Sequence, residues 1–329
     1  MTSQAAGITL EALQAGLRPR LEVVRGELAR IIASDFSLIA EVNGHLQQMR
    51  GKMFRPTLLL LSEEASGARD ERAEILAAVI ELIHLATLVH DDSVDHSALR
   101  RGMPTINALF SHQVSVIMGD YLYSRAVVEL TELGDIAPLR VLARVTNEMT
   151  VGEMRQLMAH DPLSFSESEY ELLIRSKTAS LLAGACEIGA IRAAPRERAA
   201  LREYGDRLGM VFQIVDDLLD YTGAEAVTGK PTGKDLREHK MTLPLIHALG
   251  RLTSAARKEV AVLMASPEPS DQQVGAVIAM VTENGGLDYA RAKAQSLAEQ
   301  AEAALEALEP SNARERLRES ILYVLERRS

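Results

Sequence analysis

Residues 75–95 read ILAAVIELIHLATLVHDDSVD, a long apolar run that ends in three aspartates. The apolar part, Ile75 to Val89, is 15 residues long and contains Glu81 and His84. A stretch of this length and polarity is too short to span a bilayer. It therefore predicts a buried helix of a globular protein.

The same helical pattern extends through the rest of the chain. Apolar residues recur every three or four positions, and Ala, Leu, Glu and Arg, all good helix formers, are abundant. We therefore expect an all-α protein. The predicted helices span residues 9–33, 36–49, 54–67, 70–95, 112–133, 137–160, 166–191, 196–221, 242–250, 253–265, 271–284, 287–308 and 312–327.

The domain organisation follows from what does not interrupt these helices. No Gly/Ser linker, low-complexity tract or fixed-period repeat divides the 329 residues, so we expect one domain over residues 1–329. The least helical stretch, residues 222–240, holds three glycines and three lysines and predicts a mobile basic loop. At the C-terminus we favour a frayed, solvated end for residues 326–328 over a segment that closes a site.

Charge and cysteine content exclude several classes of function. Lys and Arg total 36 against 46 Asp and Glu, a net charge of −10, which argues against a nucleic-acid partner. The single cysteine, Cys186, allows no internal disulfide and no thiolate metal site. With no secretory pattern near the N-terminus, we expect a cytoplasmic protein.

Two aspartate quintets indicate the chemistry: Asp91-Asp92-Ser-Val-Asp95 and Asp216-Asp217-Leu-Leu-Asp220. Helix positions i and i+4 share a face, so the first and last aspartate of each quintet point the same way. Carboxylates at the ends of apolar helices are costly unless they meet cations, and hard oxygen ligands suit magnesium. The spacing predicts a two-walled clamp that holds a polyphosphate through Mg²⁺.

Other polar residues are placed to complete such a site. His84 and Gln213 lie on the helical faces of the two quintets, and each could touch a ligand or be a satisfied core group. Basic residues near the expected helix ends could meet phosphates, although each one alone is equally an ordinary surface charge. They are Lys52, Arg55, Arg100, Arg101, Lys177 beside Thr178, Lys230 and Lys240.

Taken in order, these motifs resemble those of the trans-isoprenyl diphosphate synthases. The resemblance rests on Gly51-Lys52-Met-Phe-Arg55-Pro56, Ile83-His84 through Asp95 with Arg100-Arg101-Gly102, Gly119-Asp120, Lys177-Thr178, Phe212-Gln213 through Asp220, and Gly229-Lys230 through Lys240. It covers residues 45–250. Met53 departs from the family pattern, in which many members carry a second basic residue there.

The resemblance implies a homodimeric all-α bundle around a deep central cavity, with three Mg²⁺ ions on an allylic diphosphate. Metal ligands would be Asp91, Asp92, Asp95, Asp216, Asp217 and Asp220. Contacts to the allylic diphosphate would be Arg100, Lys177, Thr178, Gln213, Lys230 and Lys240. The pocket for isopentenyl diphosphate would be Lys52, Arg55, His84 and Arg101.

The size of the product is argued from the residues below the first quintet. Ala86 and Thr87 are small where short-product relatives usually carry aromatic residues, so we expect a long all-trans product of octaprenyl length, about C40, of the kind attached to quinones. Farnesyl diphosphate is the expected primer. Deeper floor candidates are Tyr123, Val127 and Leu130, for which plain core packing is an equal alternative. We expect at most peripheral membrane contact, for product release.

Three alternatives remain open. Within the same class, the chain could be a short-chain farnesyl or geranylgeranyl diphosphate synthase. A terpene cyclase or head-to-head synthase would share the fold, but the second quintet lacks the Asn/Ser/Glu pattern expected of a cyclase. A subunit of a heteromeric prenyl synthase is the alternative from a different class.

Overall fold

The computed structural model describes residues 8–49, 51–157, 162–223 and 232–327. Helices dominate it. In chain order, the helical elements are α1 (Leu10–Gln14), η1 (Ala15–Leu17), α2 (Arg18–Ile31), α3 (Ser37–Gln48), α4 (Phe54–Ser66), α5 (Ala73–Val94), α6 (Ile106–Leu109), α7 (His112–Glu132), α8 (Ile136–Leu157), η2 (Pro162–Ser164), α9 (Glu167–Ile174), η3 (Arg175–Ala179), α10 (Ser180–Gly189), α11 (Pro195–Thr222), α13 (Lys234–Arg237), α14 (Leu243–Leu249), α15 (Ser254–Ala265), α16 (Asp271–Glu283), α17 (Gly286–Leu305) and α18 (Asn312–Leu325).

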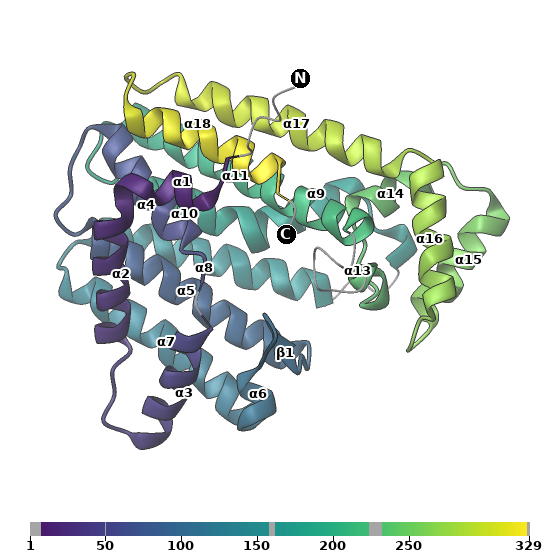
Figure 1. Ribbon diagram of the computed structural model, residues 1–329, viewed down its shortest axis with the longest axis horizontal. Helices are drawn as coiled ribbons and strands as arrows, with labels where there is room; N and C mark the ends of the chain where they lie inside the picture. Colours follow the sequence, from purple (N-terminus) through teal and green to yellow (C-terminus); the bar gives the residue numbers. More distant parts are fainter. Residues whose placement is uncertain (1–7, 50, 158–161, 224–231, 328–329) are drawn as a thin grey trace, which may run out of the picture.

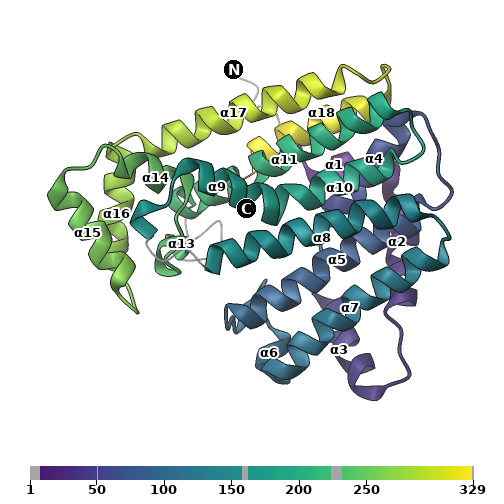
Figure 2. The same cartoon turned by 180° about the vertical axis from the view of Figure 1, so that it is seen from behind.

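The long helices stack side by side. Figures 1 and 2 show α17, α11, α10, α8, α5 and α7 in this order across the molecule, with α2 crossing at one end and the α15–α16 hairpin at the other. Helix α5 packs against α2, α4, α7 and α10, and α11 packs against α10 and α17. The two quintets thus lie on different layers of one bundle.

Two glycines one turn apart on α11 allow its close approach to the end of η3 and the start of α10. A Cβ atom at Gly209 would lie 2.4 Å from the Ala179 Cα atom, and one at Gly205 would lie 2.7 Å from the Leu182 carbonyl oxygen. Only glycine allows the backbones to come so near. This contact sets the position of the last turns of α11, which carry the second quintet.

The all-α prediction is confirmed, and most helix bounds agree to within a few residues. One predicted helix, 166–191, is interrupted at Arg175–Ala179 by a π-helical turn. A two-residue ladder, β1 (Leu99–Arg100) with β2 (Met103–Pro104), follows the first quintet, because Arg101 and Gly102 both take positive φ angles and reverse the chain. Within residues 222–240, the described part contains α13.

Helix α5 also meets the length and composition of a membrane span, in contrast to the prediction from its apolar stretch alone. Most of that helix is nevertheless buried among its neighbours, as in the core helix of many globular proteins. Its apolar character is therefore accounted for by the bundle core.

Candidate active site

The two quintets end two helices in a similar way. In each, the second aspartate is buried, at 6% exposed for Asp92 and 4% for Asp217. The first and fifth aspartates are more accessible, with Asp95 exposed and the Asp216 side chain 54% exposed. Each helix therefore leaves the carboxylates of its first and fifth aspartates accessible, whereas the second aspartate points into the protein.

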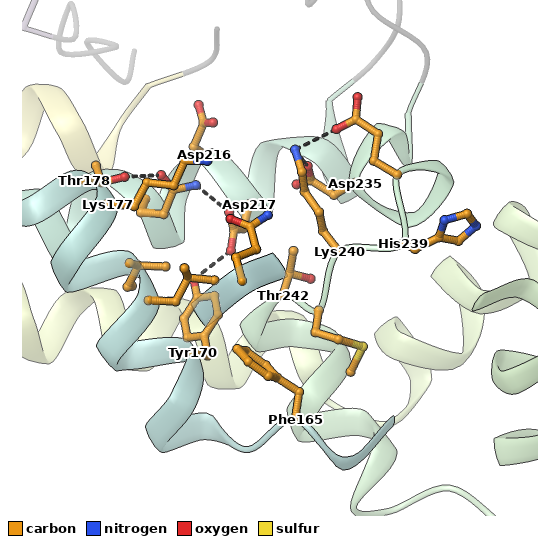
Figure 3. Close-up of a pocket in the computed structure, with 16 residues that line it drawn as sticks. Phe165, Tyr170, Lys177, Thr178, Asp216, Asp217, Asp235, His239, Lys240 and Thr242 are labelled. Atoms are coloured by element: carbon orange, nitrogen blue, oxygen red, sulfur yellow. Dashed lines mark hydrogen bonds and ion pairs between the residues drawn. The ribbon is translucent and has the colours of Figure 1, made fainter. Parts of the chain in front are cut away.

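A cavity of about 440 Å³ lies along the second quintet. Figure 3 shows its lining, to which η3, α11 and the segment after α13 all contribute. Six predicted site residues line it, namely Lys177, Thr178, Gln213, Asp216, Asp217 and Lys240. The structure thus brings together residues up to 63 positions apart in the sequence, from Lys177 to Lys240.

Asp217 closes a chain of neutral hydrogen bonds inside this cavity (Figure 3). Thr178 Oγ1 donates to Gln213 Oε1 at 2.9 Å, and Gln213 Nε2 donates to Asp217 Oδ1 at 2.8 Å. Tyr170 donates its hydroxyl to Asp217 Oδ2 at 2.7 Å. Burial, helped by the nearby charge of Asp235, raises the pKa of Asp217 to about 8, against the opposing effect of the hydrogen bonds from Tyr170 and Gln213. Tyr170 was not predicted, since it is joined to the motif only through folding.

Asp220 is held from the other side by the start of α13. It accepts hydrogen bonds from the backbone nitrogens of Lys234 at 3.0 Å and Asp235 at 2.9 Å. Near it, Lys240 Nζ lies 3.5 Å from Asp235 Oδ1 and 2.6 Å from Glu238 Oε2. Burial alone would lower the pKa of Lys240, but these carboxylates raise it, so the lysine stays charged. Lys230 lies outside the described residues.

The first quintet is tied to the cavity through Lys177. Its Nζ atom lies 3.8 Å from Asp91 Oδ2 and 2.7 Å from Glu153 Oε2 on α8. Burial raises the pKa of Asp91 to about 6, with Lys177 opposing that rise. Glu153 is a site residue that sequence reasoning missed. On the same helix end, Arg100 Nε contacts both carboxylate oxygens of Asp92, at 2.9 and 2.8 Å.

A smaller basic pocket lies behind the first quintet. It is lined by Gly51, Glu81, His84, Arg100 and Arg101, among others. Burial together with the charges of Arg55, Arg101 and Arg100 lowers the pKa of His84 well below its usual value, so that the imidazole is neutral. Of the four residues predicted to form one pocket, His84 and Arg101 line it. Arg55 and the exposed Lys52 do not line it, although the charge of Arg55 acts on His84 and that of Arg101 on Lys52.

The C-terminal end differs from the expected solvated segment. The Arg327 side chain is only 10% exposed, and its Nη2 atom lies 3.5 Å from Asp216 Oδ1. Its guanidinium carbon lies 4.1 Å from the centre of the Phe212 ring. Helix α18 brings this arginine to the second quintet, which no local pattern in the sequence could indicate.

The proposed floor residues occupy varied positions. Ala86 and Leu130 are buried in the core at 2% exposed, whereas Tyr123 is 39% exposed on α7. Thr87 and Val127 are half-buried. In the described part of the chain, none of these five lines the 440 Å³ cavity or the basic pocket. Tyr123 in particular lies at the surface of a single chain rather than beneath a cavity.

The donor set can be tested for its fit to divalent metal ions. Within the described ranges, no three His, Cys, Asp or Glu side chains are grouped so that they could hold a metal by themselves. Carboxylate oxygens nevertheless face the cavity from two helices, and burial raises the pKa of Asp91 and of Asp220. Carboxylates short of positive charge fit hard cations whose shell is completed by phosphate oxygens and water. Asp91, Asp95 and Asp216 fit this role best. Asp220 accepts two backbone hydrogen bonds but is less buried than Asp92 and Asp217, which are bonded inside the protein.

These features define a class of protein: an all-α bundle in which one aspartate-rich helix end lines a cavity, and a lysine of that cavity pairs with a second aspartate-rich helix end that adjoins a basic pocket. Comparison with known proteins narrows that class. The polyprenyl synthetase family model matches residues 36–281. The heptaprenyl diphosphate synthase component 2 of Geobacillus stearothermophilus is 36% identical over 319 residues, 96% of this chain and 98% of that protein.

Two further relatives agree. The all-trans-nonaprenyl-diphosphate synthase (geranyl-diphosphate specific) of Rhodobacter capsulatus is 40% identical over 288 residues, 87% of this chain and 88% of that protein. The crystal structure of a polyprenyl synthase from Caulobacter crescentus, complexed with calcium and isoprenyl diphosphate, has a TM-score of 0.92 and 34% identity, and covers 98% of this chain and 99% of that one. The chain belongs to the polyprenyl synthetase family and is a trans-prenyl diphosphate synthase, a prenyltransferase.

Proposed function

We propose that this prenyltransferase, acting as one domain over residues 1–329, uses Mg²⁺ to condense isopentenyl diphosphate head-to-tail (1′-4) onto an allylic diphosphate. Farnesyl diphosphate is the proposed primer, and the proposed product is an all-trans chain of octaprenyl length for a quinone side chain. The observation that carries the proposal is Lys177, which lines the second quintet's cavity and also contacts Asp91 of the first quintet. One cation between two aspartate walls suits a diphosphate held by metal ions.

The chain's own residues support ionisation of the allylic substrate. Asp91, Asp95, Asp216 and Asp220 would hold three magnesium ions, which draw charge from the departing diphosphate oxygens. Lys177 and Lys240, which line the cavity, and Arg100, held by Asp92, would place fixed positive charge at the same oxygens. Lys230, which lies outside the described residues, is proposed from the resemblance to do the same. Thr178 and Gln213 would contact the same substrate while keeping Asp217 in place.

The second substrate is assigned to the basic pocket. Lys52, Arg55 and Arg101 would bind the diphosphate of isopentenyl diphosphate, and the neutral His84 would donate or accept a single hydrogen bond. Holding its double bond against the allylic carbon supplies the alignment that carbon–carbon bond formation requires. Proton loss to the released diphosphate then completes the step, since the site's carboxylates are engaged elsewhere.

Product length is the less constrained part of the proposal. The relatives include heptaprenyl, octaprenyl and nonaprenyl synthases, and the octaprenyl diphosphate synthase of Escherichia coli (strain K12) is 36% identical over 298 residues. Small Ala86 and Thr87 support a long product. Ala86→Phe is then expected to shorten the product, and unchanged product length would contradict the argument from small residues.

The direct test is an incubation of purified protein with Mg²⁺, farnesyl diphosphate and labelled isopentenyl diphosphate, followed by separation of the dephosphorylated products by length. A ladder ending at octaprenyl length would support both the reaction and the length. A stop at fifteen or twenty carbons would keep the reaction and support the short-chain alternative. No magnesium-dependent elongation from any allylic primer would overturn the proposal.

We also propose a cytoplasmic homodimer that touches membranes only peripherally. Helices α7 and α8 carry exposed apolar side chains suited to a protein interface, namely Val116, Ile117, Tyr123, Val128, Ile136, Val151 and Met154. Light scattering on the purified protein should give twice the chain mass of 35.9 kDa.

A second candidate function is that of one subunit of a heteromeric synthase, as the name of one relative suggests. The Geobacillus stearothermophilus protein is named component 2 of a heptaprenyl diphosphate synthase. This chain would then be a catalytic component that needs a partner, and its aspartates would be present but inactive alone. Elongation by the purified chain without any other protein would exclude this alternative.

A further inference from the structure

Four glutamates are buried in the described ranges, and one of them differs from the others. Three form ion pairs with arginines: Glu63 with Arg20, Glu129 with Arg30, and Glu187 with Arg144. Glu81 is 4% exposed, and its Oε2 atom has no hydrogen-bond partner. A buried polar oxygen without a partner is rare in native proteins and requires an explanation.

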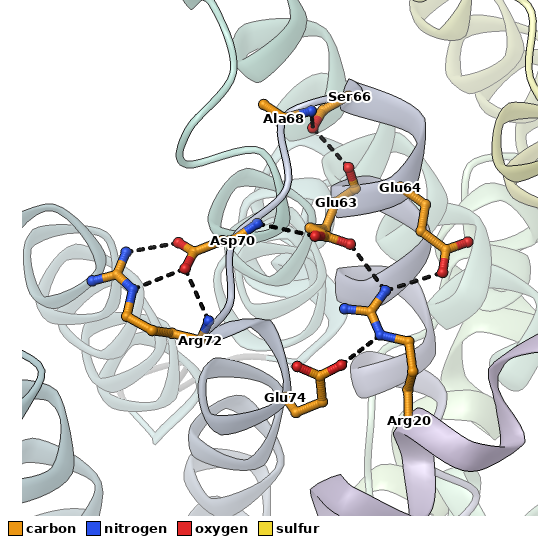
Figure 4. Close-up of polar contacts among 8 residues, drawn as sticks. All are labelled: Arg20, Glu63, Glu64, Ser66, Ala68, Asp70, Arg72 and Glu74. Carbon is orange, nitrogen blue, oxygen red and sulfur yellow. Dashed lines mark hydrogen bonds and ion pairs between the residues drawn. The ribbon is translucent and has the colours of Figure 1, made fainter.

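Glu63 shows how this fold satisfies a buried glutamate (Figure 4). Its Oε2 atom accepts from Arg20 Nη1 at 2.9 Å, and its Oε1 atom accepts from the backbone nitrogen of Asp70 at 3.0 Å. Both oxygens are used, and the network lies at the α2–α4–α5 end of the bundle, apart from the cavity residues. Glu63 therefore provides a matched comparison, a buried glutamate of α4 with a structural role.

Glu81 instead lines the basic pocket, one helical turn before His84 on α5. The chain at Gly51 runs directly over it: a Cβ atom there would lie 2.8 Å from Glu81 Oε1 and 3.9 Å from Arg101 Nη1. Any side chain at position 51 would displace the carboxylate. The glycine thus keeps Glu81 beside the arginines of the pocket.

In the described part of the chain Glu81 forms no hydrogen bond or ion pair with an arginine, so its charge acts on Arg55 and Arg101 through space across the pocket. Arg55 Nε is also buried without a hydrogen-bond partner. Burial and the positive charge of Arg101 lower the pKa of Arg55 to about 10, and Glu81 is the group that opposes this decrease. Burial raises the pKa of Glu81 itself, against the charges of Arg55 and Arg101. Two guanidinium groups that repel each other are therefore held near one buried anion.

We propose that Glu81 is a positioning residue of the isopentenyl diphosphate pocket. Its carboxylate keeps the guanidinium groups of Arg55 and Arg101 side by side, so that both meet one diphosphate when it binds. This inference rests on the proposed function, because it takes the basic pocket as the site of the second substrate. Glu81 was noted in the sequence only as an interruption of an apolar run.

The direction in which Glu81→Gln changes diphosphate binding distinguishes a positioning role of Glu81 from a simple effect of its charge. If Glu81 only added negative charge near an anion site, Glu81→Gln would strengthen diphosphate binding. If it positions the arginines, Glu81→Gln weakens binding although the pocket becomes more positive. We expect at least tenfold weaker binding of isopentenyl diphosphate, measured by calorimetry without allylic substrate so that no reaction occurs.

Steady-state kinetics supply a second readout. Glu81→Gln should raise the KM for isopentenyl diphosphate about tenfold or more, with the KM for the allylic diphosphate within twofold of wild type. Glu81→Asp, which keeps the charge, should recover part of the loss. Glu63→Gln is the matched control, expected to lower thermal stability and leave both KM values unchanged.

Gly51→Ala tests the same contact from the other side and remains informative if Glu81→Gln folds poorly. It should weaken isopentenyl diphosphate binding similarly. The Gly51→Ala/Glu81→Gln double variant should bind isopentenyl diphosphate no more weakly than the weaker-binding of the two single variants, since each substitution disturbs the same carboxylate. Unchanged or tighter binding in Glu81→Gln, or equal changes in both KM values, would overturn the inference. A wild-type protein that neither binds nor elongates isopentenyl diphosphate would instead overturn the proposed function.

Discussion

The two aspartate quintets share one pattern, DDxxD, and one position, the C-terminal end of an apolar helix. In both, the second aspartate is buried and bonded inside the protein. The partners differ: Asp92 meets the guanidinium of Arg100, whereas Asp217 meets the hydroxyl of Tyr170 and the amide of Gln213. Identical motifs are thus supported by a charged pair on one wall and by neutral groups on the other.

This difference separates two kinds of aspartate. At the first positions, Asp216 lines the cavity and Asp91 lies beside its Lys177, and we propose that the first and fifth positions hold the metal ions, so their loss should remove catalysis. The second position acts through its partner, and the cost of losing it should depend on whether that partner is charged. The four predictions below test this order, from the largest effect to the smallest.

Asp91→Asn or Asp216→Asn should lower kcat by about 10²–10³-fold or more, because each removes a carboxylate that would hold the metal ions, which would supply positive charge to the leaving diphosphate. Elongation assays at saturating Mg²⁺ measure it. Asp288→Asn is the control: this aspartate lies on α17 with its side chain 86% exposed, so the variant should match wild type. A loss below tenfold in Asp91→Asn would mean that the first wall is not a metal wall.

Asp92→Asn should have a smaller effect on kcat but a clear effect on stability. It leaves the partly buried Arg100, whose side chain is 31% exposed, without its counter-ion, which costs about 1–3 kcal/mol of unfolding free energy. Urea unfolding alongside the elongation assay separates the two effects. If Asp92→Asn matched Asp91→Asn in activity and wild type in stability, Asp92 would itself be a metal ligand, as the family resemblance implied.

Asp217→Asn should be milder than Asp92→Asn in both measurements. Burial raises the pKa of this carboxyl to about 8, so the fold already disfavours its charge, and the asparagine oxygen can still accept one of the two hydrogen bonds from Tyr170 and Gln213. We expect a change in unfolding free energy of about 1 kcal/mol. A larger loss of activity than in Asp92→Asn would reverse the proposed order of the two walls.

The sequence predicted those parts of the site that are local. Helices with strong apolar periodicity were placed well. The i, i+4 spacing predicts that Asp91 pairs with Asp95 and Asp216 with Asp220 as metal ligands, and that pairing stays a prediction. Such relations depend only on helical geometry. The resemblance supplied the roles of the basic residues, of which Lys177 and Lys240 line the cavity and Arg100 and Arg101 line the basic pocket.

Contacts across the bundle could not be predicted. Tyr170 reaches Asp217 over 47 positions, and Arg327 reaches Asp216 only because α18 returns across α4 and α11. Nor does apolar periodicity mark the π-helical turn at Arg175–Ala179, which presents Lys177 and Thr178 to the cavity. From the sequence, Glu81 is only an interruption of an apolar run, because the charges that act on it belong to Arg55 and Arg101, which lie on other segments of the chain.

Tyr170→Phe should have the smallest effect of the four. The ring stays buried and only the bond to Asp217 is lost, so we expect a loss of about 1 kcal/mol in unfolding free energy and little change in kcat. The Asp217→Asn/Tyr170→Phe double variant then decides how the second wall is built. If the hydroxyl acts only through Asp217, the two single losses are not additive. If the two losses of unfolding free energy are fully additive, Tyr170 supports the cavity independently of Asp217. The second quintet is then not held by one connected network of neutral groups, and its contrast with the first quintet is lost.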